Sequence, residues 1–289
     1  MSGPADTTAR PPAAPALLLT LLAMLAFAGN SLLCRVALRD TPIDAASFTS
    51  MRLCSGALTL WLLVRFTRGP GATARAGDWR SALALFVYAA GFSWAYLQLS
   101  AGLGALLLFG AVQATMIGYG LVRGERFVAR QTAGLLLALA GLVGLLLPGA
   151  AAPAPGAALL MLAAGAAWGV YSLRGRSGGD PLRVTAGNFA RSVPFTLLLS
   201  AVLYAQAEPA PAGLAYAVAS GALASGVGYA VWYAALPTLK ASTAATVQLS
   251  VPVIAALGGV AFLGETLTVR LLVAGVAILG GIALVIRAR

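Results

Sequence analysis

The chain has 289 residues, of which 60% are apolar and only 9% are charged, and its formal net charge is +11. Soluble proteins usually carry charge at about a quarter of their positions, so this composition nearly excludes a soluble globular enzyme. The sequence contains no histidine, which removes the commonest general base and the commonest metal ligand. We therefore expect a protein that is not an enzyme and that binds no cofactor and no metal ion.

Ten apolar runs follow one another along the chain, and each can cross a bilayer as a helix of about 20 residues. Lipid offers no partner for an unpaired backbone group, so each run is predicted to be a membrane-spanning α-helix. The segment before them, residues 1–15, is rich in Pro, Ala and Thr and is predicted to be a disordered cytoplasmic tail. A tight turn at Ser100–Gly102 is expected between the third and fourth spans. The predicted spans are Ala16–Val36, Ala45–Val64, Ala82–Leu99, Gly102–Val122, Gln131–Leu147, Pro155–Leu173, Val184–Tyr204, Gly213–Leu236, Ala241–Leu263 and Val269–Ile286.

The first span has a second interpretation, as part of a cleaved signal peptide. Ala26-Phe27-Ala28 is similar to a signal-peptidase site. However, only one base, Arg10, precedes the apolar run, and the run continues well past that site. We therefore predict that the segment stays in the protein as a span.

The basic residues predict the orientation of the chain. If the spans alternate, fourteen of the nineteen bases lie on the side of the two termini, and three, Arg35, Arg39 and Arg270, lie on the other side. Loops rich in Lys and Arg stay in the cytoplasm, so both termini are predicted to be cytoplasmic. The Ala-, Gly- and Arg-rich composition is typical of a bacterial protein, which predicts the bacterial inner membrane.

The chain also repeats itself at an offset of about 140 residues. The repetition predicts two halves, residues 16–150 and 151–289, each with five spans. An odd number of spans per half turns the second half upside down in the membrane, and such inverted repeats place a substrate site near the midplane between them. A chance alignment of Ala-, Gly- and Leu-rich spans is the alternative, against which the polar landmarks argue. These landmarks are Ala28-Gly29-Asn30-Ser31 with Trp168-Gly169-Val170-Tyr171, Asp40 with Asp180, Arg52 with Arg191, and Gly124-Glu125 with Gly264-Glu265.

These features together resemble the drug/metabolite transporter superfamily and its EamA-type carriers, and among them most of all the YddG-type aromatic amino acid exporters. The shared features are the five-plus-five spans, the pair Trp168-Gly169, an Arg in spans two and seven, and Gly-Glu after spans four and nine. The first half departs from the pattern: it has Ala28 in place of Trp168, and its fourth span lacks the proline that the ninth has as Pro252. The resemblance implies an all-α, ten-helix basket with a central cavity lined by spans 1, 3, 4, 6, 8 and 9, which works by alternating access.

Aromatic residues within the spans are the first candidates for substrate contact. They are Tyr88 and Trp94 in span three, Trp168 in span six, and Tyr229 and Trp232 in span eight. Tyr and Trp combine a flat apolar face with a hydrogen-bonding tip, which suits an aromatic or amphiphilic solute and cation–π contact with an ammonium group. The alternative is the aromatic belt at the membrane interface.

Polar residues within the spans are the second group of candidates. Gln248, Ser250 and Pro252 cluster in span nine, where Pro252 has no N–H to donate and leaves the carbonyl of Gln248 free. Gln113 in span four is a plausible counterpart, and Asn30 is the polar residue of span one. The alternative role for these side chains is hydrogen bonding between helices.

Charged residues are read as mainly structural. All eight acids map to loops or span ends, so no intramembrane carboxylate is available as a proton carrier. Arg52 and Arg191 lie within spans. They either anchor a substrate carboxylate or serve the structure, with Arg191 reaching the carbonyl of Ala190 or with either one reaching a loop acid, and the structural role is favoured.

The Gly-Glu pairs that follow spans four and nine are also read as structural. A glycine at this position can adopt the left-handed conformation that ends a helix. The carboxylates of Glu125 and Glu265 are then expected to favour the N-terminus of the next helix.

The sequence thus predicts an exporter of neutral, preferentially aromatic, amino acids and similar metabolites, working by facilitated diffusion or exchange. A proton-coupled drug or metabolite efflux pump is the alternative. The expected partners are a small-molecule substrate and the lipid bilayer. Nucleic acid is not expected, because no basic cluster interleaves with aromatic residues. A monomer is expected, because duplication already supplies both halves.

Overall fold

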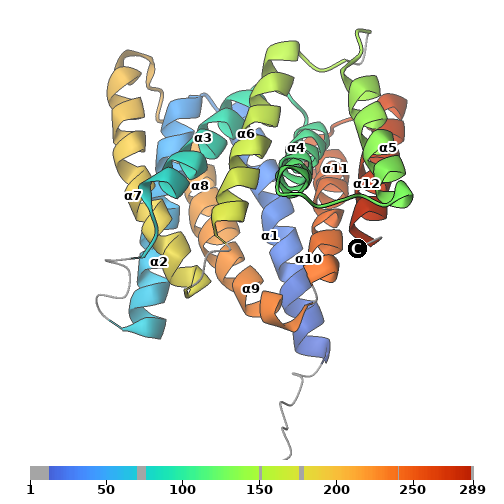
Figure 1. The fold of residues 1–289 in the computed structure, drawn as a ribbon. Helices are drawn as coiled ribbons and strands as arrows, with labels where there is room; N and C mark the ends of the chain where they lie inside the picture. Colours follow the sequence, from blue (N-terminus) through green and yellow to red (C-terminus); the bar gives the residue numbers. More distant parts are fainter. Residues whose placement is uncertain (1–12, 70–75, 150–151, 176–178, 240, 288–289) are drawn as a thin grey trace, which may run out of the picture.

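The computed structural model describes residues 13–69, 76–149, 152–175, 179–239 and 241–287, and every regular element within these ranges is helical. Most of the helices run roughly side by side in one bundle (Figure 1). The elements are α1 (Ala13–Asp40), α2 (Ala45–Arg68), α3 (Trp79–Tyr96), α4 (Ala101–Val122), α5 (Ala129–Leu146), α6 (Pro155–Arg174), α7 (Pro181–Val202), η1 (Tyr204–Gln206), α8 (Pro211–Val218), η2 (Ala219–Val227), α9 (Gly228–Ala235), η3 (Leu236–Thr238), α10 (Ala241–Gln248), α11 (Ser250–Leu263) and α12 (Val269–Arg287).

Helices occupy all ten of the predicted apolar runs, with small shifts at their ends. Within the described residues, eight helical segments are long and apolar enough to cross a membrane. Two predicted spans, which correspond to α3 and α7, are helical but are not among these eight. The predicted disorder of residues 1–15 is wrong for Ala13–Pro15, which belong to α1, and residues 1–12 lie outside the described ranges. The turn between α3 and α4 is Leu97–Ser100, slightly before the predicted position.

Aspartates begin three of the helices. Asp44, Asp78 and Asp180 are the N-cap residues of α2, α3 and α7, and each carboxylate accepts a backbone N–H of the first turn. Such caps satisfy donors that have no partner within the helix. Asp40, which the sequence paired with Asp180, is the last residue of α1, whereas Asp180 is the N-cap of α7; the aspartate that caps α2 is Asp44.

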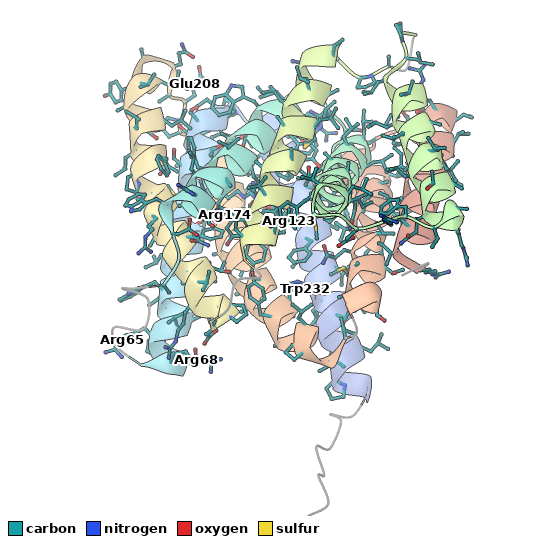
Figure 2. All side chains as sticks on the ribbon, in the orientation of Figure 1. Arg65, Arg68, Arg123, Arg174, Glu208 and Trp232 are labelled. Atoms are coloured by element: carbon teal, nitrogen blue, oxygen red, sulfur yellow. The ribbon has the colours of Figure 1, made fainter. Side chains whose placement is uncertain are left out.

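The connections between helices gather at two ends of the bundle. At the end where α1 begins, here called the termini end, the Nε of Arg68, the last residue of α2, lies 2.7 Å from a carboxylate oxygen of Asp180, which precedes α7. At the opposite end, here called the far end, the backbone N–H of Glu208 before α8 donates to Asp44 before α2, at 2.8 Å. Figure 2 shows Arg68 and Glu208 at opposite ends of the molecule. Long helices that follow one another therefore alternate in direction.

The helices pack as two flanking pairs around a central group. Helix α2 packs on α7, and α5 packs on α12, so that these two pairs flank the bundle (Figure 1). Between them, α6 packs on α3 and α4, while α1 packs on α9, η2 and α11. Large apolar side chains on α5 and α12 are exposed, as expected of surfaces that face lipid tails rather than water. They include Leu136, Leu139, Val143, Val273 and Val276.

One segment within the eighth apolar run departs from α-helical geometry. Residues Ala219–Val227 form a π-helix, a wider form that is frequent at functional sites. Gly221 in this segment packs directly on α2. A Cβ at Gly221 would overlap with the backbone oxygen of Arg52 and with the hydroxyl of Ser55.

Replacing Gly221 by alanine is therefore expected to destabilise the fold. The backbone of Arg52 cannot move aside as a flexible side chain would, and overpacking of this kind costs roughly 1–3 kcal/mol. Thermal unfolding in detergent should show a lower midpoint for Gly221→Ala. The matched control is Gly144→Ala in α5, where nothing lies within 4 Å of the added methyl group. An unchanged midpoint in Gly221→Ala would contradict the close packing of η2 on α2.

Candidate functional site: a central aromatic cavity

A cavity of about 700 Å³ lies at the centre of the bundle. Its wall is formed by α1, α3, α4, α6, α7, η2, α9 and α10, together with residues of the connections near α6 and α10. It extends to the termini end, where Gly175, Pro181 and Leu239 line it, and it stops before the far end, at Ser31 and Phe92. Helix α7 was not expected in the wall, whereas α5 and α12 lie outside it, as expected. None of the described residues that line the cavity is charged.

Trp168 is the centre of an aromatic cluster in the cavity wall. The centroid of its ring system lies 4.8 Å from that of Tyr88, 5.1 Å from that of Tyr171 and 5.5 Å from that of Tyr229. The rings of Tyr171 and Tyr229 are stacked with it, at interplanar angles of 23° and 17°. Phe27 extends the cluster: the centroid of its ring lies 5.7 Å from that of Tyr229. These flat faces can hold an aromatic ring or an ammonium group.

Uncharged polar side chains interrupt the aromatic wall. Asn30, Gln113 and Gln248 line the cavity from α1, α4 and α10. The hydroxyl of Thr185 on α7 donates to the hydroxyl of Tyr233 on α9, at 3.0 Å. Such groups can orient a polar solute by hydrogen bonds without adding charge.

The structure places seven of the predicted contact residues in the cavity wall: Asn30, Tyr88, Gln113, Trp168, Tyr229, Trp232 and Gln248. The other three do not line it. Trp94 lies six residues after Tyr88 on α3, which turns it to another side of the helix. The hydroxyl of Ser250 donates to the carbonyl of Val247, three residues earlier in the chain, at 2.7 Å. Pro252 is buried in α11, beyond the break at Leu249 that separates this helix from α10.

Several wall residues were not predicted from the sequence. Phe92 follows Tyr88 by one helical turn, so the spacing i, i+4 could have indicated it. Phe27 and Asn30 lie three residues apart on α1 and therefore share a face, so Asn30 could have indicated Phe27. Thr185 and Asn188 could not be found in this way, because α7 was expected outside the wall.

The two arginines within the spans have different surroundings. The Nη1 of Arg191 donates to the carbonyls of Ala76 and Gly187, which fixes the segment before α3 on α7. The expected contact with the carbonyl of Ala190 is therefore replaced by contact with these two. Arg52 is 2% exposed, and its Nη2 donates to the hydroxyl of Tyr88 at 2.8 Å. It reaches no loop acid within the described residues, contrary to one of the expected structural roles.

Nearer the far end than the cavity, a set of contacts joins α1, the α3–α4 turn and the segment after α11. The Nε of Arg35 lies 3.2 Å from the Glu265 carboxylate, and the Nη1 of Arg35 donates to the carbonyl of Tyr96 at 2.8 Å. The other carboxylate oxygen of Glu265 accepts the backbone N–H of Ala101 at 2.8 Å. We call Arg35, Glu265 and the Ala101 N–H the latch.

The latch corrects one expectation about the Gly-Glu pairs. Gly124 and Gly264 have positive φ values of 90° and 63°, which confirms the predicted left-handed conformation. The carboxylate of Glu265, however, caps the beginning of α4 and not that of the next helix, α12. Its position beside Arg35 comes from the fold, since 230 residues separate the two in sequence.

At the termini end, the ionised carboxylates of Asp78 and Asp180 link neighbouring helices. The Asp78 carboxylate accepts from the Ser81 hydroxyl at 2.6 Å and from Nη2 of Arg174 at 2.8 Å. Burial alone would raise the pKa of Asp78, but hydrogen bonds from Ser81 and the Arg174 guanidinium outweigh it and lower that pKa to about 2. The pKa of Asp180 is also lowered, because the Arg68 hydrogen bond and backbone N–H groups outweigh its burial.

Comparisons with known proteins agree with this architecture. Residues 155–287 match the EamA-like transporter family. The uncharacterized protein PA1977 of Pseudomonas aeruginosa is 62% identical over 273 residues, which cover 94% of this chain and 95% of that protein. The threonine/homoserine exporter RhtA is 38% identical over 118 residues in Salmonella typhimurium. In Escherichia coli it is 36% identical over 115 residues, and each alignment covers 38% of both chains.

One solved crystal structure has the same fold, with a TM-score of 0.65 and 20% identity, covering 93% of this chain and 96% of that one. The likeness extends over almost the whole bundle and is thus not confined to the half that the family comparison matches. The chain therefore belongs to the same family as PA1977, and its residues 155–287 are similar to the EamA-like transporter family.

Proposed function

We propose that this chain is a bacterial inner-membrane carrier that exports neutral amino acids, with a preference for aromatic ones, by alternating access. The central observation is the uncharged aromatic cavity, which extends to the termini end and stops before the far end. Its volume of about 700 Å³ is in the range of small-molecule sites. A zwitterionic amino acid matches such a cavity, because it carries no net charge while offering both an apolar side chain and polar groups.

The arrangement of helices supports ten spans in two inverted halves, 16–150 and 151–289. Helix α2 packs on α7 and α5 on α12, and each pair joins helices that hold corresponding places in the two halves. The basic residues of the described loops lie mainly at the termini end, which we assign to the cytoplasm. In this orientation the cavity faces the cytoplasm, as an exporter requires when it loads its solute. The two halves together supply both sides of the cavity, so we propose that the protein acts as a monomer.

The relatives support the class of solute. RhtA is named a threonine/homoserine exporter, and its alignment with part of this chain favours amino acids over other metabolites. The rings around Trp168 favour aromatic members of that class, in keeping with the resemblance to the YddG-type exporters. We propose phenylalanine as the first solute to test.

In the proposed cycle, the solute enters from the cytoplasm, the termini end closes, and the latch at the far end opens. A zwitterion carries no net charge across the membrane, so its movement alone should respond little to the membrane potential. The cavity wall contains no carboxylate that could carry a proton, within the residues described. We therefore propose that the solute gradient drives export. A proton-coupled efflux pump is the second candidate and would need a titrating group elsewhere.

Transport should depend little on pH between about pH 5.5 and pH 8 when the pH is equal on both sides of the membrane. The pKa of Asp78 is lowered to about 2. The stabilisation that the ionised Asp78 carboxylate gives to the folded state is therefore complete above the ordinary carboxyl pKa. It is lost only as the pH falls through about 2. Exchange of labelled phenylalanine across liposomes is the measurement. A sigmoid or bell-shaped profile centred within the tested range would contradict the absence of a proton carrier.

Export from cells tests the direction of transport. Bacteria that overproduce the protein are fed a phenylalanine-containing dipeptide, which intracellular peptidases cleave, and phenylalanine in the medium is measured over time. We expect faster release than from cells that produce Trp168→Ala at the same level in the membrane. Equal release from both strains would contradict phenylalanine export, and release that stops when the proton gradient is collapsed would favour the proton-coupled candidate.

A further inference from the structure

Arg52 is a buried cation without a countercharge. It is 2% exposed, no carboxylate among the described residues pairs with it, and its Nε and Nη1 have no hydrogen-bond partner there. Its guanidinium carbon lies 5.1 Å from the ring centroid of Tyr88 and 4.8 Å from that of Phe92. Ionisable groups within a membrane protein usually pair with one another or mark a substrate pathway. The cation–π contacts hold the guanidinium in place but leave the positive charge uncompensated.

The charge of Arg52 reaches the cavity through Tyr88. Arg52 does not line the cavity, whereas Tyr88 and Phe92, the two rings against it, do. The Tyr88 hydroxyl oxygen accepts from the Nη2 of Arg52 at 2.8 Å and from the side-chain amide of Asn30 at 3.3 Å. The hydroxyl of Ser220 donates to the other end of the Asn30 amide at 2.6 Å, which fixes the orientation of that amide.

These contacts leave the Tyr88 hydroxyl as a hydrogen-bond donor. A phenol oxygen offers two lone pairs and one O–H. Donors from Arg52 and Asn30 occupy both lone pairs, so the proton of the hydroxyl remains for a group within the cavity. A donor that is itself polarised by a cation binds an anionic acceptor more strongly than a neutral one.

We propose that the part of the cavity nearest the far end is a carboxylate subsite, in which the solute carboxylate accepts a hydrogen bond from the Tyr88 hydroxyl. Arg52 is the positioning residue behind it: it orients that hydroxyl and supplies the countercharge. The proposal rests on the proposed function, since it assigns the orientation of the amino acid in the same cavity. The solute class is then any small molecule with a carboxylate beside an aromatic or apolar group, and amines without a carboxylate should bind more weakly.

The rest of the cavity fits the other end of such a solute. Trp168 lies next to Tyr88 and stacks with Tyr229, and Gln248 adds an amide from α10. An ammonium group can bind to these ring faces and to an amide oxygen. Arg191 offers no second carboxylate site of this kind, because the carbonyls of Ala76 and Gly187 already hold its guanidinium.

The test compares ligands that differ only in their charged group. Purified protein in detergent is heated with 3-phenylpropionate, which has a carboxylate and no amine, or with phenethylamine, which has an amine and no carboxylate. We expect 3-phenylpropionate to stabilise the wild type at concentrations about tenfold lower than phenethylamine does. Tyr88→Phe keeps the ring and the cation–π contact but removes the hydroxyl, and we expect this preference to disappear.

Two further variants separate a charge effect from a general effect on the cavity. Tyr233→Phe removes another cavity hydroxyl that touches no cation, and it should leave the ratio between the two ligands as in the wild type. Arg52→Lys retains the positive charge and should keep a weaker preference for the carboxylate. A preference lost as fully in Arg52→Lys as in Tyr88→Phe would contradict the role of the charge.

Three results would overturn the subsite: no stabilisation by 3-phenylpropionate, equal stabilisation by both ligands, or an unchanged preference in Tyr88→Phe. Counterflow of phenylalanine in liposomes is measured on the same preparations. Counterflow without a carboxylate preference would leave the carrier function in place and reject the subsite. A carboxylate preference without counterflow would keep the subsite and reject phenylalanine transport.

Discussion

Replacing Trp168 by alanine is expected to reduce exchange of phenylalanine across liposomes by about tenfold or more. Trp168 contacts Tyr88, Tyr171 and Tyr229, so its removal takes away a stacking surface and also releases three neighbouring rings. Aromatic pairs contribute about 0.5–1.5 kcal/mol each beyond the area they bury, and a central anchor often dominates binding. The measurement is the initial rate of counterflow as a function of phenylalanine concentration.

The loss of phenylalanine exchange should result from the change in the cavity and not from the removal of a tryptophan as such. Trp61 on α2 is 47% exposed on the outer surface, so Trp61→Ala is the matched control and should transport like the wild type. Trp168→Phe keeps an aromatic face and should retain most of the activity. Full activity in Trp168→Ala, with a monodisperse sample, would remove the aromatic cluster from the transport site.

Replacing Glu265 by glutamine is expected to open the far end of the cavity. The carboxylate joins Arg35 on α1 to the beginning of α4, and its side chain is only 11% exposed. Hydrogen bonds to charged groups contribute about 1.5–3 kcal/mol, so losing the charge should shift the balance between the two open states by about tenfold or more. Transport should then become limited by the return to the cytoplasm-facing state.

A native cysteine reports on this shift. Cys34 is fully buried and lies one turn beyond Asn30 and Ser31, on the face of α1 that lines the cavity. In a Cys54→Ser background, a membrane-impermeant maleimide added outside the cell should label Cys34 faster in Glu265→Gln. The control is Asp40→Asn, which removes an exposed acid that pairs with its neighbour Arg39 at the same end. Equal labelling in all three proteins would mean that the latch does not control access.

Hydropathy alone predicted the positions of the helices because the bilayer imposes both their length and their internal hydrogen bonding. The faces of the helices were harder to predict. Tyr88 and Trp94 were both expected in the cavity, yet six residues on a helix correspond to about 240° of rotation, so the two cannot share one face. Tyr88 and Phe92 do share one, and both line the cavity. In spans that are apolar all round, periodicity gives too weak a signal to choose the inner face.

Contacts between distant parts of the chain could not be predicted from the sequence. The repeated Gly-Glu pairs predicted where two helices end, and their glycines have the expected conformation. The partners of Glu265, however, are Arg35 and Ala101, and their proximity depends on how the two halves pack. In the same way, Arg52 was visible as a charge within a span. Its hydrogen bond to Tyr88 and the absence of a countercharge among its described neighbours required the three-dimensional structure.

The most direct test of a carrier for aromatic amino acids is counterflow in liposomes that contain the purified protein. The vesicles are loaded with unlabelled phenylalanine and diluted into trace labelled phenylalanine, with and without a pH gradient. We predict a transient accumulation of label inside the vesicles that does not depend on the gradient. The absence of accumulation in a folded, monodisperse preparation would contradict phenylalanine transport, and accumulation only with the gradient would contradict carriage without protons.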